Sequence, residues 1–592
     1  MPDAEEGLIA DVAVDPDGDY AYLARWGGSA CAGPEGGQGG RVTDGGVYIV
    51  DIRNPDGSID ETPEQVGFIR THQDTLVGEG MQVVHLTTSK FTGDVLVINH
   101  EQCGKNGKGG VSLWDVTNPL APKKLSENFG DLTINGQRDT PDVNQTHSAF
   151  AWDAGDSAYL VATDDEEDAD VDIFDITDPK HPVLIEELDL NVYNVSQPSI
   201  GLTESFLHDM VVKQIDGRYL MLLSYWDGGY VLLDVTDPAN ALFLRDSTFT
   251  NPDPELLQQF GSSLTPEGNG HQAEFTSDNR YVIGTDEDFA PYRLGEFRIT
   301  SGPNADAYPS VIVSGAAAPS ILPDLTLSGP VMYGGYGCPD SAPIPPPSAE
   351  YLALLQPGDE KIIVLQRGPS GDPNASEAAC FPGEKAHEAV LAGWDAVVFV
   401  NRHVTPDALF CGSGAFVDEI VGVCVTHATF HTLFGEAVSY TYPDGPAIGT
   451  IGERIVVDSV FDGWGYVHLF DRTTLAELDT YAIPEAMDPA FARGFGDLSV
   501  HEVAVDPHPD RVGTAYLSYY SGGLRAIQIV SDTAICAAQG DTTTPCLVEV
   551  GGFIDPGGNN FWGVETFVDD QTGDTIILAS DRDSGLWMFR DP

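Results

Sequence analysis

Four histidines recur at one place in a repeated strand pattern. They stand in the runs QTHSAFAW, FLHDMVV, GHQAEFT and VHEVAV, as His147, His208, His271 and His501. Each begins an apolar, alternating run, which predicts a β-strand. If these runs are equivalent innermost strands of a ring, the four imidazoles converge beside its axis. Imidazole nitrogens suit Zn, Cu, Fe and Ni, so the pattern predicts a transition-metal centre.

Carboxylates lie close to these histidines along the chain. They are Asp209, Glu274, Glu502 and, in the corresponding run that lacks a histidine, Glu565. A carboxylate that accepts the outer N–H of a metal-bound imidazole fixes its tautomer and orientation. We expect these four residues to play that part, with backbone carbonyls as the other acceptors.

A purely structural role also explains the histidines. A repeat multiplies any residue that hydrogen-bonds the neighbouring unit, with no metal involved. The corresponding positions of three further units hold Ala10, Met81 and Val564. A structural histidine should recur in every unit, whereas a ligand set need occupy only one side of the ring. Both interpretations stay open from the sequence.

The loops between the second and third strands of the units are acidic. They read NHEQCGKNGKGG, TDDEEDADVD, SYWDGG, TDEDFAPYR and SDRDSG, and strand direction puts them at the same rim as the histidines. Oxygen ligands in this density suit Ca²⁺ or a second metal, and a solvated acidic rim is the alternative. The candidate residues are Glu101, Asp165, Glu166, Asp286, Glu287 and Asp288. Trp26, Trp226 and Tyr519 stand at matching strand ends and predict an aromatic wall or ordinary packing.

One phrase recurs seven times and defines the units. It reads GGVYIVDIRNP at Gly45, GGVSLWDVTNPLAP at Gly109, VDIFDITDPKHP at Val171 and GGYVLLDVTDPAN at Gly228, with weaker copies at Trp464, Gly522 and Ser584. Two further strand-like runs precede each copy, and another follows most copies. Four short antiparallel strands per unit, repeated radially, predict an all-β seven-bladed β-propeller.

A segment of different character interrupts the fifth unit. It contains KIIVLQRG at Lys361 and CFPGEKAHEAVLAGWDAVVFVNR at Cys380, where strands alternate with a helix. This alternation predicts an inserted α/β domain. The expected organisation is propeller blades 1 to 5 (first part) at 1–296, the insert at 297–457, and the rest of the propeller at 458–592.

Both parts resemble known families. The phrases GGVYIVDI, GGVSLWDVTNPLAP and GGYVLLDVTDPAN resemble the LVIVD-repeat propellers, secreted bacterial proteins of largely unassigned function. The insert resembles a protease-associated (PA) domain in YGGYGCP at Tyr333 and in the two runs at Lys361 and Cys380. That resemblance implies a noncatalytic lid or ligand-docking module. Because the insert is attached at a rim loop, we expect it to cover the channel mouth. The sequence has no HExxH or GxSxG motif of a peptidase.

The four-histidine pattern is also similar in architecture to two groups of metal propellers. These are the carotenoid oxygenases, which hold iron with four histidines, and the selenium-binding, methanethiol-oxidising propellers. The similarity is not a sequence match, so it carries no chemistry over to this chain.

Composition excludes several classes of function. Against 28 Lys and Arg stand 92 Asp and Glu, a formal charge of -64. Such a chain repels phosphate backbones and anionic lipid, which argues against nucleic-acid partners. Excess Asp with few Lys is typical of a protein that stays soluble in brine, as in halophiles, and an acidic secreted protein is the alternative. No apolar run is long enough for a transmembrane segment, and residues 1–20 lack a signal-peptide pattern.

The cysteines point to an oxidising compartment. All eight fall into local pairs, predicted as Cys31–Cys103, Cys338–Cys380, Cys411–Cys424 and Cys536–Cys546. Disulfides persist outside the cytosol. We therefore expect an extracellular or cell-surface protein whose export signal is absent from this chain.

Three functions remain open from the sequence. The first is a secreted or cell-surface propeller whose PA lid and rim bind a small-molecule, peptide or glycan ligand. The second is an oxidative metalloenzyme with Cu, Fe or Zn on the four histidines. The third is a Ca²⁺-dependent, lactonase-like hydrolase that uses the acidic rim.

Overall fold

The protein consists of two compact units in the computed structural model. The first comprises Met1–Pro291 and Gly463–Pro592, and the second is the inserted segment Tyr292–Asp462. The structure describes residues 9–26, 45–71, 75–102, 107–131, 133–134, 137–138, 145–203, 205–261, 264–368, 379–540 and 544–591. The boundaries expected from the sequence, 297 and 457, lie inside this second unit, because its paired end strands start earlier and finish later than the pattern suggested.

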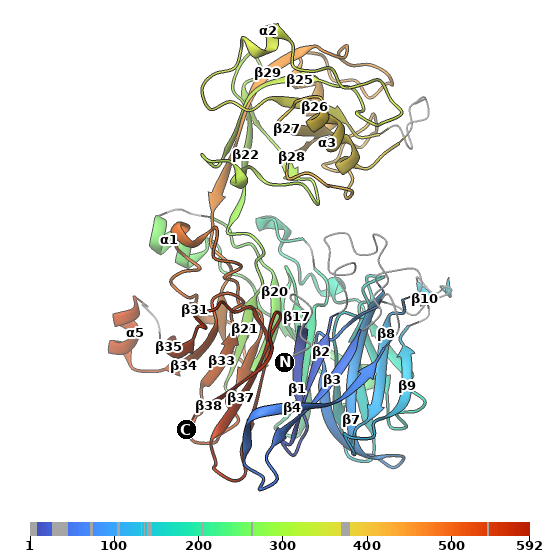
Figure 1. Cartoon of the computed structure of the whole chain (residues 1–592), viewed down its shortest axis with the longest axis vertical. Helices are drawn as coiled ribbons and strands as arrows, with labels where there is room; N and C mark the ends of the chain where they lie inside the picture. The colour runs from blue at the N-terminus through green and yellow to red at the C-terminus, as the bar shows by residue number, and fades with distance from the viewer. Residues whose placement is uncertain are drawn as a thin grey trace. The chain divides into compact units, whose positions relative to one another are not determined.

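The first unit contains seven antiparallel sheets that form a seven-bladed β-propeller, as the repeat predicts. Figure 1 shows its strands, from the first in blue to the last in red. Blade 1 contains β1 (Ile9–Val14), β2 (Tyr20–Arg25), β3 (Gly46–Arg53) and β4 (Ile59–Arg70). Blade 2 contains β5 (Thr75–Val77), β6 (Gln82–Thr87), β7 (Thr92–Gln102), β8 (Gly110–Asp115) and β9 (Lys123–Phe129). A two-stranded ribbon follows, β10 (Thr133–Ile134) with β11 (Gln137–Arg138).

The next three blades surround the candidate site. Blade 3 contains β12 (Ala149–Asp153), β13 (Ala158–Thr163), β14 (Val171–Asp175) and β15 (Val183–Leu188). Blade 4 contains β16 (Asp209–Ile215), β17 (Arg218–Tyr225), β18 (Gly229–Asp234) and β19 (Leu242–Asp246), followed by α1 (Pro254–Phe260). Blade 5 contains β20 (Gly270–Phe275), β21 (Tyr281–Asp286), β30 (Val467–Asp471) and β31 (Glu477–Tyr481). Because β21 pairs with β30, the second unit interrupts a hairpin between the second and third strands of blade 5.

The last two blades complete the ring. Blade 6 contains β32 (Val503–Val505), β33 (Thr514–Ser518), β34 (Leu524–Val530) and β35 (Cys546–Phe553), with α5 (Thr533–Gln539) before its outer strand. Blade 7 contains β36 (Phe561–Val568), β37 (Thr575–Asp581) and β38 (Gly585–Asp591). Within the described ranges, no helix is long and apolar enough to cross a membrane.

Apolar residues on both faces of the middle strands hold adjacent blades together. One buried cluster joins Val97 and Leu113 of blade 2 to Ala151 and Leu160 of blade 3. Another joins blade 3 to blade 4, and the pattern recurs around the ring. A strand buried on both faces reads as a nearly continuous apolar run, which explains why the third-strand phrases were conspicuous in the sequence.

Polar side chains at the start of the innermost strands connect neighbouring blades at three junctions. Asp11 Oδ2 accepts a hydrogen bond from the backbone N–H of Met81 at 3.0 Å. Glu502 Oε2 accepts one from Val564 N–H at 3.0 Å, and Asp209 Oδ1 accepts one from the Ser148 hydroxyl at 2.5 Å. These bonds align the strand starts around the channel and thereby fix the height of the residues that precede them.

The second unit is built on one mixed eight-stranded sheet. Its order is β23 (Asp306–Tyr308), β22 (Tyr292–Ile299), β29 (Ile451–Phe461), β25 (Thr326–Tyr333), β26 (Ile362–Gln366), β27 (Ala396–Val400), β28 (Val421–Val425) and β24 (Ser310–Ile312). Strands β25 to β28 are parallel. The helices of this unit are α2 (Ala349–Leu352), α3 (Pro382–Leu391) and α4 (His427–Leu433).

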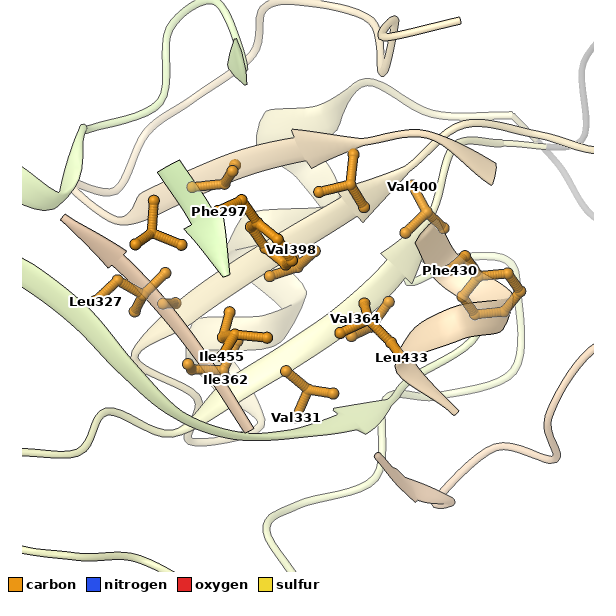
Figure 2. Close-up of a cluster of buried hydrophobic side chains, with 14 of the residues drawn as sticks. Phe297, Leu327, Val331, Ile362, Val364, Val398, Val400, Phe430, Leu433 and Ile455 are labelled. Carbon is orange, nitrogen blue, oxygen red and sulfur yellow. The ribbon is translucent and has the colours of Figure 1, made fainter. Parts of the chain in front are cut away.

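Apolar clusters cover both faces of this sheet. Figure 2 shows one of them, in which Val364 of β26 lies beside Leu433 of α4 and Val398 of β27 lies beside Phe297 of β22. The other contains Ile363, Phe399 and Trp394 with Ala386 and Ala389 of α3. Helices on a parallel sheet are typical of an α/β arrangement.

Three of the four predicted disulfides are confirmed. Cys338–Cys380 and Cys411–Cys424 lie in the second unit, with Cα–Cα distances of 5.7 and 5.8 Å. Cys536–Cys546 joins α5 to β35 at 5.7 Å. The fourth pair, Cys31–Cys103, lies outside the described residues.

We predict that Cys31 and Cys103 form the fourth disulfide. All other cysteines have a partner within their own segment, which leaves these two for each other. Peptide mapping of the non-reduced protein should find a peptide pair that contains both residues. Alkylation of either thiol without prior reduction would contradict this pairing.

The ring closes where blade 7 meets blade 1. Strand β1 packs against β36 and β37, and Ile9 N–H donates to the carbonyl of Arg582 at 3.2 Å. On the far side of the same junction Arg53 Nη1 lies 2.6 Å from Asp569 Oδ1, and both side chains are largely buried. Burial opposes ionisation of Asp569, but hydrogen bonds from Arg53 and Thr572 hold its pKa below the ordinary value.

We predict that Asp569→Asn lowers the free energy of unfolding by about 2–4 kcal/mol, because the largely buried guanidinium of Arg53 loses its buried carboxylate. Among the described residues, this guanidinium keeps only the exposed Asp19 at 3.3 Å as a charged partner. Since the folded pKa of Asp569 is depressed, its contribution is present above the unfolded pKa of about 3.9 and is lost as the pH falls. Denaturant titration at neutral and acidic pH measures both effects.

The matched control is Arg218→Met in blade 4. Its ion pair with Asp234 has a half-exposed arginine, and exposed pairs contribute at most about 1 kcal/mol. Equal losses in the two variants would contradict a special role of the blade 1–blade 7 junction.

Candidate metal centre

The four predicted histidines lie side by side in the propeller channel. Ring centroids are 4.3 Å apart between His147 and His208 and between His208 and His271, and 4.1 Å apart between His271 and His501. They come from blades 3 to 6, at or just before the start of β12, β16, β20 and β32. The repeat therefore brings four imidazoles from consecutive blades to one place.

A carboxylate that the sequence reading missed lies at the centre of this group. Glu79, in blade 2, has Oε2 at 3.0 Å from His147 Nε2 and Oε1 at 2.9 Å from His271 Nε2. Its Oε1 is also 3.9 Å from His208 Nε2 and 3.8 Å from His501 Nε2. All four Nε2 atoms thus face a single carboxylate that is only 4% exposed.

A glycine on each side of Glu79 sets its position. Gly78 and Gly80 both have left-handed backbone conformations, with φ of 96° and 62°. A Cβ at Gly80 would stand 2.1 Å from the Ser148 hydroxyl oxygen, and one at Gly78 would stand 2.0 Å from Ala24 Cβ. Only glycine satisfies both the conformation and the space. The tripeptide therefore carries the carboxylate into the channel just before β6 begins.

Three of the four outer nitrogens have their own partners, whereas His271 Nδ1 is buried without a hydrogen bond among the described residues. His147 Nδ1 is 2.5 Å from Glu101 Oε1, His208 Nδ1 is 3.3 Å from the carbonyl of His271, and His501 Nδ1 is 3.1 Å from the carbonyl of Trp562. With Nδ1 directed outward, Nε2 is the nitrogen that faces the centre.

One expectation from the sequence needs correction, namely that the outer nitrogens of the imidazoles bond to Asp209, Glu274, Glu502 and Glu565. Asp209 and Glu502 hold the neighbouring blades, as described above, although Glu502 Oε1 also comes within 3.7 Å of His501 Nδ1. Glu274 and Glu565 line a different cavity of about 300 Å³ farther along the innermost strands, together with Asp11. A side chain that follows a histidine by one to three residues in a strand points away from it or lies lower in the channel, which the linear pattern did not take into account.

The charges of the cluster alternate. Burial opposes ionisation of Glu79, but His147 and His271 hold its pKa well below the ordinary value. Burial and the neighbouring imidazoles lower the pKa of His208 and of His501, so both are neutral and keep a lone pair. Burial is outweighed by Glu79 and Glu101 at His147 and by Glu287 and Glu79 at His271, which raise the pKa of these two residues.

Several inward atoms are buried and lack a hydrogen bond among the described residues. They are Glu79 Oε1, His147 Nε2 and His271 Nε2. They lie close to one another without the alignment of a hydrogen bond. One ligand atom each from Glu79, His147 and His208 lies within 4.8 Å of the others, and the same holds for Glu79, His271 and His501. This convergence of unsatisfied nitrogens and oxygen fits a metal ion.

Glu287 is a second carboxylate at the centre. Its Oε2 is 3.5 Å from His271 Nε2, and its Oε1 is 3.7 Å from His501 Nε2. The hydroxyl of Tyr520 donates a hydrogen bond to the same carboxylate. Glu287 therefore stands beside the cluster in a fixed orientation, as an additional ligand or as a base toward the cavity.

The rim carboxylates do not gather at one site. Glu101 and Glu287 belong to the histidine cluster, and Asp165 lines the cavity above it. Asp286 lies inside blade 5, where His468 Nε2 is 2.5 Å away. Asp288 accepts a hydrogen bond from Ala290 N–H, and Glu166 is an exposed residue of the β13–β14 loop.

A cavity of about 710 Å³ opens directly above the cluster. Its walls include Trp26, Phe206, Trp226, Tyr520 and Trp562, so an aromatic wall is present, with Tyr520 in place of the expected Tyr519. Tyr519 is fully buried in the core of blade 6. The acidic residues of the β13–β14 loop form another wall, and burial raises the pKa of Asp164 and of Asp170 to about 7.

The similarities of this chain to known proteins are weak. No known family profile matches the chain, and no curated protein sequence matches it. Among solved structures, the Sqt1 protein of Chaetomium thermophilum is 11% identical over 100% of this chain and 98% of its own, with a TM-score of 0.40. The Cps50 (Swd1) β-propeller domain of Myceliophteria thermophila is 10% identical over 99% and 98%, with a TM-score of 0.37.

A zinc aminopeptidase of Bacillus subtilis, BSAP, is 15% identical over 32% of this chain, with a TM-score of 0.18. The match spans about a third of the aminopeptidase, 35% of its length. At such low similarity the function must be inferred from this chain's own residues.

His468 illustrates a buried histidine with a structural role. It stands between two carboxylates, with Nε2 2.5 Å from Asp286 Oδ2 and Nδ1 2.7 Å from Glu477 Oε1. Burial lowers the pKa of His468, but these carboxylates outweigh burial and raise it well above 6.5. Its imidazolium holds β30 to β21 and β31 within blade 5.

We predict that His468→Gln lowers the free energy of unfolding by about 3–5 kcal/mol near neutral pH, because two buried carboxylates lose their cation. A raised folded pKa means that the contribution is fully present below the unfolded pKa of about 6.5 and is lost as the pH rises through the folded value. Unfolding curves of both proteins at several pH values measure the difference. An unchanged difference at strongly alkaline pH would contradict the charged state.

Proposed function

We propose that the protein is a propeller metalloprotein that binds one transition-metal ion in its channel and acts on a small molecule in the cavity above. The ligands are Glu79 and the Nε2 atoms of the four histidines, with Glu287 beside them. The observation that carries the proposal is the convergence of four imidazole nitrogens on one buried, incompletely hydrogen-bonded carboxylate. Neutral His208 and His501 have lone pairs for the ion. The ion would displace the protons that a raised pKa favours on His147 and His271.

The donor set favours iron or copper and oxidative chemistry. Catalytic zinc sites usually have three protein ligands and one open position. Here five protein groups converge, four of them imidazoles, which suit Fe and Cu as well as Zn. A bound ion would supply electron-transfer or oxygen chemistry, while the protein residues orient it and present it to the cavity. We therefore place oxidoreductase ahead of hydrolase activity.

The calcium-dependent hydrolase is the weaker alternative. Ca²⁺ takes six to eight oxygen ligands. The rim carboxylates expected for it are distributed over the histidine cluster, the cavity wall and the interior of blade 5. A carboxylate group consisting of Asp131, Glu167 and Glu187 does occur at the rim, but it has no nitrogen ligand and no separate indication of an ion.

A ligand-binding role without catalysis uses the same cavity. Its volume of about 710 Å³ is in the range of small-molecule sites. The inserted unit leaves the propeller after Pro291, four residues after Glu287. Its parallel strands, its helices and the Cys338–Cys380 disulfide support the PA-like assignment as a ligand-docking module. Its role as a lid stays a prediction.

An extracellular location is also part of the proposal. The three disulfides are of a kind that persists in oxidising compartments, and the formal charge of -64 fits a salt-rich medium. The LVIVD-type assignment of the propeller rests on the repeated third-strand phrase.

We predict that the purified protein retains one Fe or Cu ion per chain and that His271→Ala/His501→Ala loses it. Removal of two of the four imidazoles leaves too few nitrogens to hold the ion, whereas the blades keep their apolar contacts. Plasma mass spectrometry measures the metal, and circular dichroism verifies the fold. Glu79→Gln should weaken retention as well, by about 10- to 100-fold in affinity, because the ion loses an anionic ligand.

The matched control is His85→Ala/His181→Ala, which removes two exposed histidines of blades 2 and 3. It should leave metal content unchanged. If the wild type holds no transition metal after growth and reconstitution with Fe, Cu or Zn, the cluster is a buried acid–base network and the metalloprotein proposal is wrong. Retention of Ca²⁺ alone would favour the hydrolase.

A further inference from the structure

One residue of each blade surrounds the cavity at the same register. It stands one or two positions beyond the last residue of the second strand that pairs with the third strand. Pairings such as Arg25 with Gly46 and Tyr225 with Gly229 define the end of that strand. Around the ring these residues are Trp26, Glu101, Asp165, Trp226, Glu287, Tyr520 and Arg582. Six of them line the cavity, and Glu101 bonds His147.

Two aromatic members of this ring have strained backbones. Trp226 and Tyr520 have φ of 24° and 41°, values that bulky residues rarely adopt. Each is held there by a bridge to the first strand of the next blade, Trp226 to Gly270 and Tyr520 to Phe561. Strain of this kind persists where the surroundings impose it and is concentrated at ligand sites.

An aromatic pair stands beside the acidic wall. Phe206 stacks on Trp226 with ring centroids 5.4 Å apart, although 41% of Phe206 is exposed. The acidic loop of blade 3 is joined to this pair, because Asp170 accepts hydrogen bonds from the Tyr225 hydroxyl at 2.6 Å and from Leu207 N–H at 2.7 Å. Asp165 and Glu167 of the same loop line the cavity next to it.

The charge of the cavity is strongly one-sided. Its lining carboxylates are Glu79, Asp164, Asp165, Glu167, Asp170 and Glu287. Among the described lining residues, Arg582 is the single Lys or Arg, and His147 is a histidine whose pKa is raised. Burial raises the pKa of Asp164 and of Asp170 to about 7 and that of Asp165 to about 8. These three are therefore not fully ionised near neutral pH in the empty cavity, and a bound cation would favour their ionised forms. The guanidinium of Arg582 lies 4.6 Å from the ring centroid of Trp562, so the aromatic wall already stacks with a cation. A negative, aromatic cavity attracts cations and repels anions.

We propose that this cavity binds an organic cation, with an ammonium group between the Phe206–Trp226 pair and the carboxylates of Asp165 and Glu167. This inference rests on the proposed function in one respect, namely that the bound cation is the substrate. The cation subsite itself consists of residues outside the metal ligands. The rest of the ligand would extend along the aromatic wall toward the histidine cluster.

Three probes of similar size distinguish the alternatives. Benzylamine is a cation near neutral pH, benzyl alcohol is neutral and benzoate is an anion. Isothermal titration of the whole protein, with and without metal, should show that benzylamine binds about tenfold more tightly than the other two, the magnitude expected of a desolvated cation–π contact. The preference should weaken as salt is added.

Two variants locate the subsite. Asp165→Asn/Glu167→Gln and Trp226→Leu should each reduce benzylamine affinity by about tenfold, leave metal content unchanged and keep the circular dichroism spectrum. The control Glu61→Gln/Glu64→Gln removes two exposed carboxylates of β4 and should change nothing. Rescue by Trp226→Phe, which keeps an aromatic face, would separate stacking from simple loss of volume.

The outcomes separate this inference from the metal proposal. Equal affinities for the three probes, or tighter benzoate binding that Arg582→Met abolishes, would overturn the cation site even if the metal is bound. A benzylamine preference in a protein that holds no metal would support the cation site and contradict the metalloprotein. Loss of metal in Asp165→Asn/Glu167→Gln would mean that the loop supports the cluster and not a ligand.

Discussion

One buried carboxylate opposite four imidazoles is the constraint on which the candidate site depends. Glu79 is almost completely removed from water, and removal of a charge from water is costly unless partners compensate. Two of the imidazoles provide that compensation in the structure, and a metal ion would provide more. The residues around it are arranged for this one point: Glu101 and two backbone carbonyls hold outer nitrogens, and Tyr520 holds Glu287.

The propeller supplies this arrangement through its strand starts. Each innermost strand begins at a height fixed by hydrogen bonds from the neighbouring blade, such as those of Asp11, Asp209 and Glu502. The residue at or just before the start of the strand therefore lies in the channel, whatever its type. In blades 3 to 6 it is histidine, and in blade 2 the turn of Gly78 and Gly80 brings in Glu79. Asp209 and Glu502, which follow the histidines in the chain, thus hold neighbouring blades in register. Among the described residues, neither of these two accepts a hydrogen bond that would fix the tautomer of an imidazole.

The repeated parts of the propeller could be predicted from the sequence, and the carboxylate at its centre, which occurs once, could not. Third strands buried on both faces produce the recurring apolar phrase, so the number of blades and the equivalence of the four histidines followed from it. Glu79 occurs once, in a loop whose conformation depends on two glycines and on the space beside Ser148 and Ala24. An acid between two glycines just before an innermost strand was a signal that could have been noticed. Asp286 shows the opposite error, since an acidic run suggested a rim residue where a buried ion pair with His468 lies.

The residues at the ends of the second strands, one in each blade, show how backbone and side chain can have separate roles in one fold. In several blades the backbone at this position hydrogen-bonds the start of an innermost strand. Trp226 and Tyr520 bridge to the strand of the next blade, and Glu287 and Arg582 donate to the strand of their own blade. The side chains, by contrast, are three aromatics, three acids and one base. Because the backbone makes the structural contacts, the side chain is free to vary from blade to blade. The ring of strand starts can therefore hold a metal while the ring just above it determines which molecule reaches that metal.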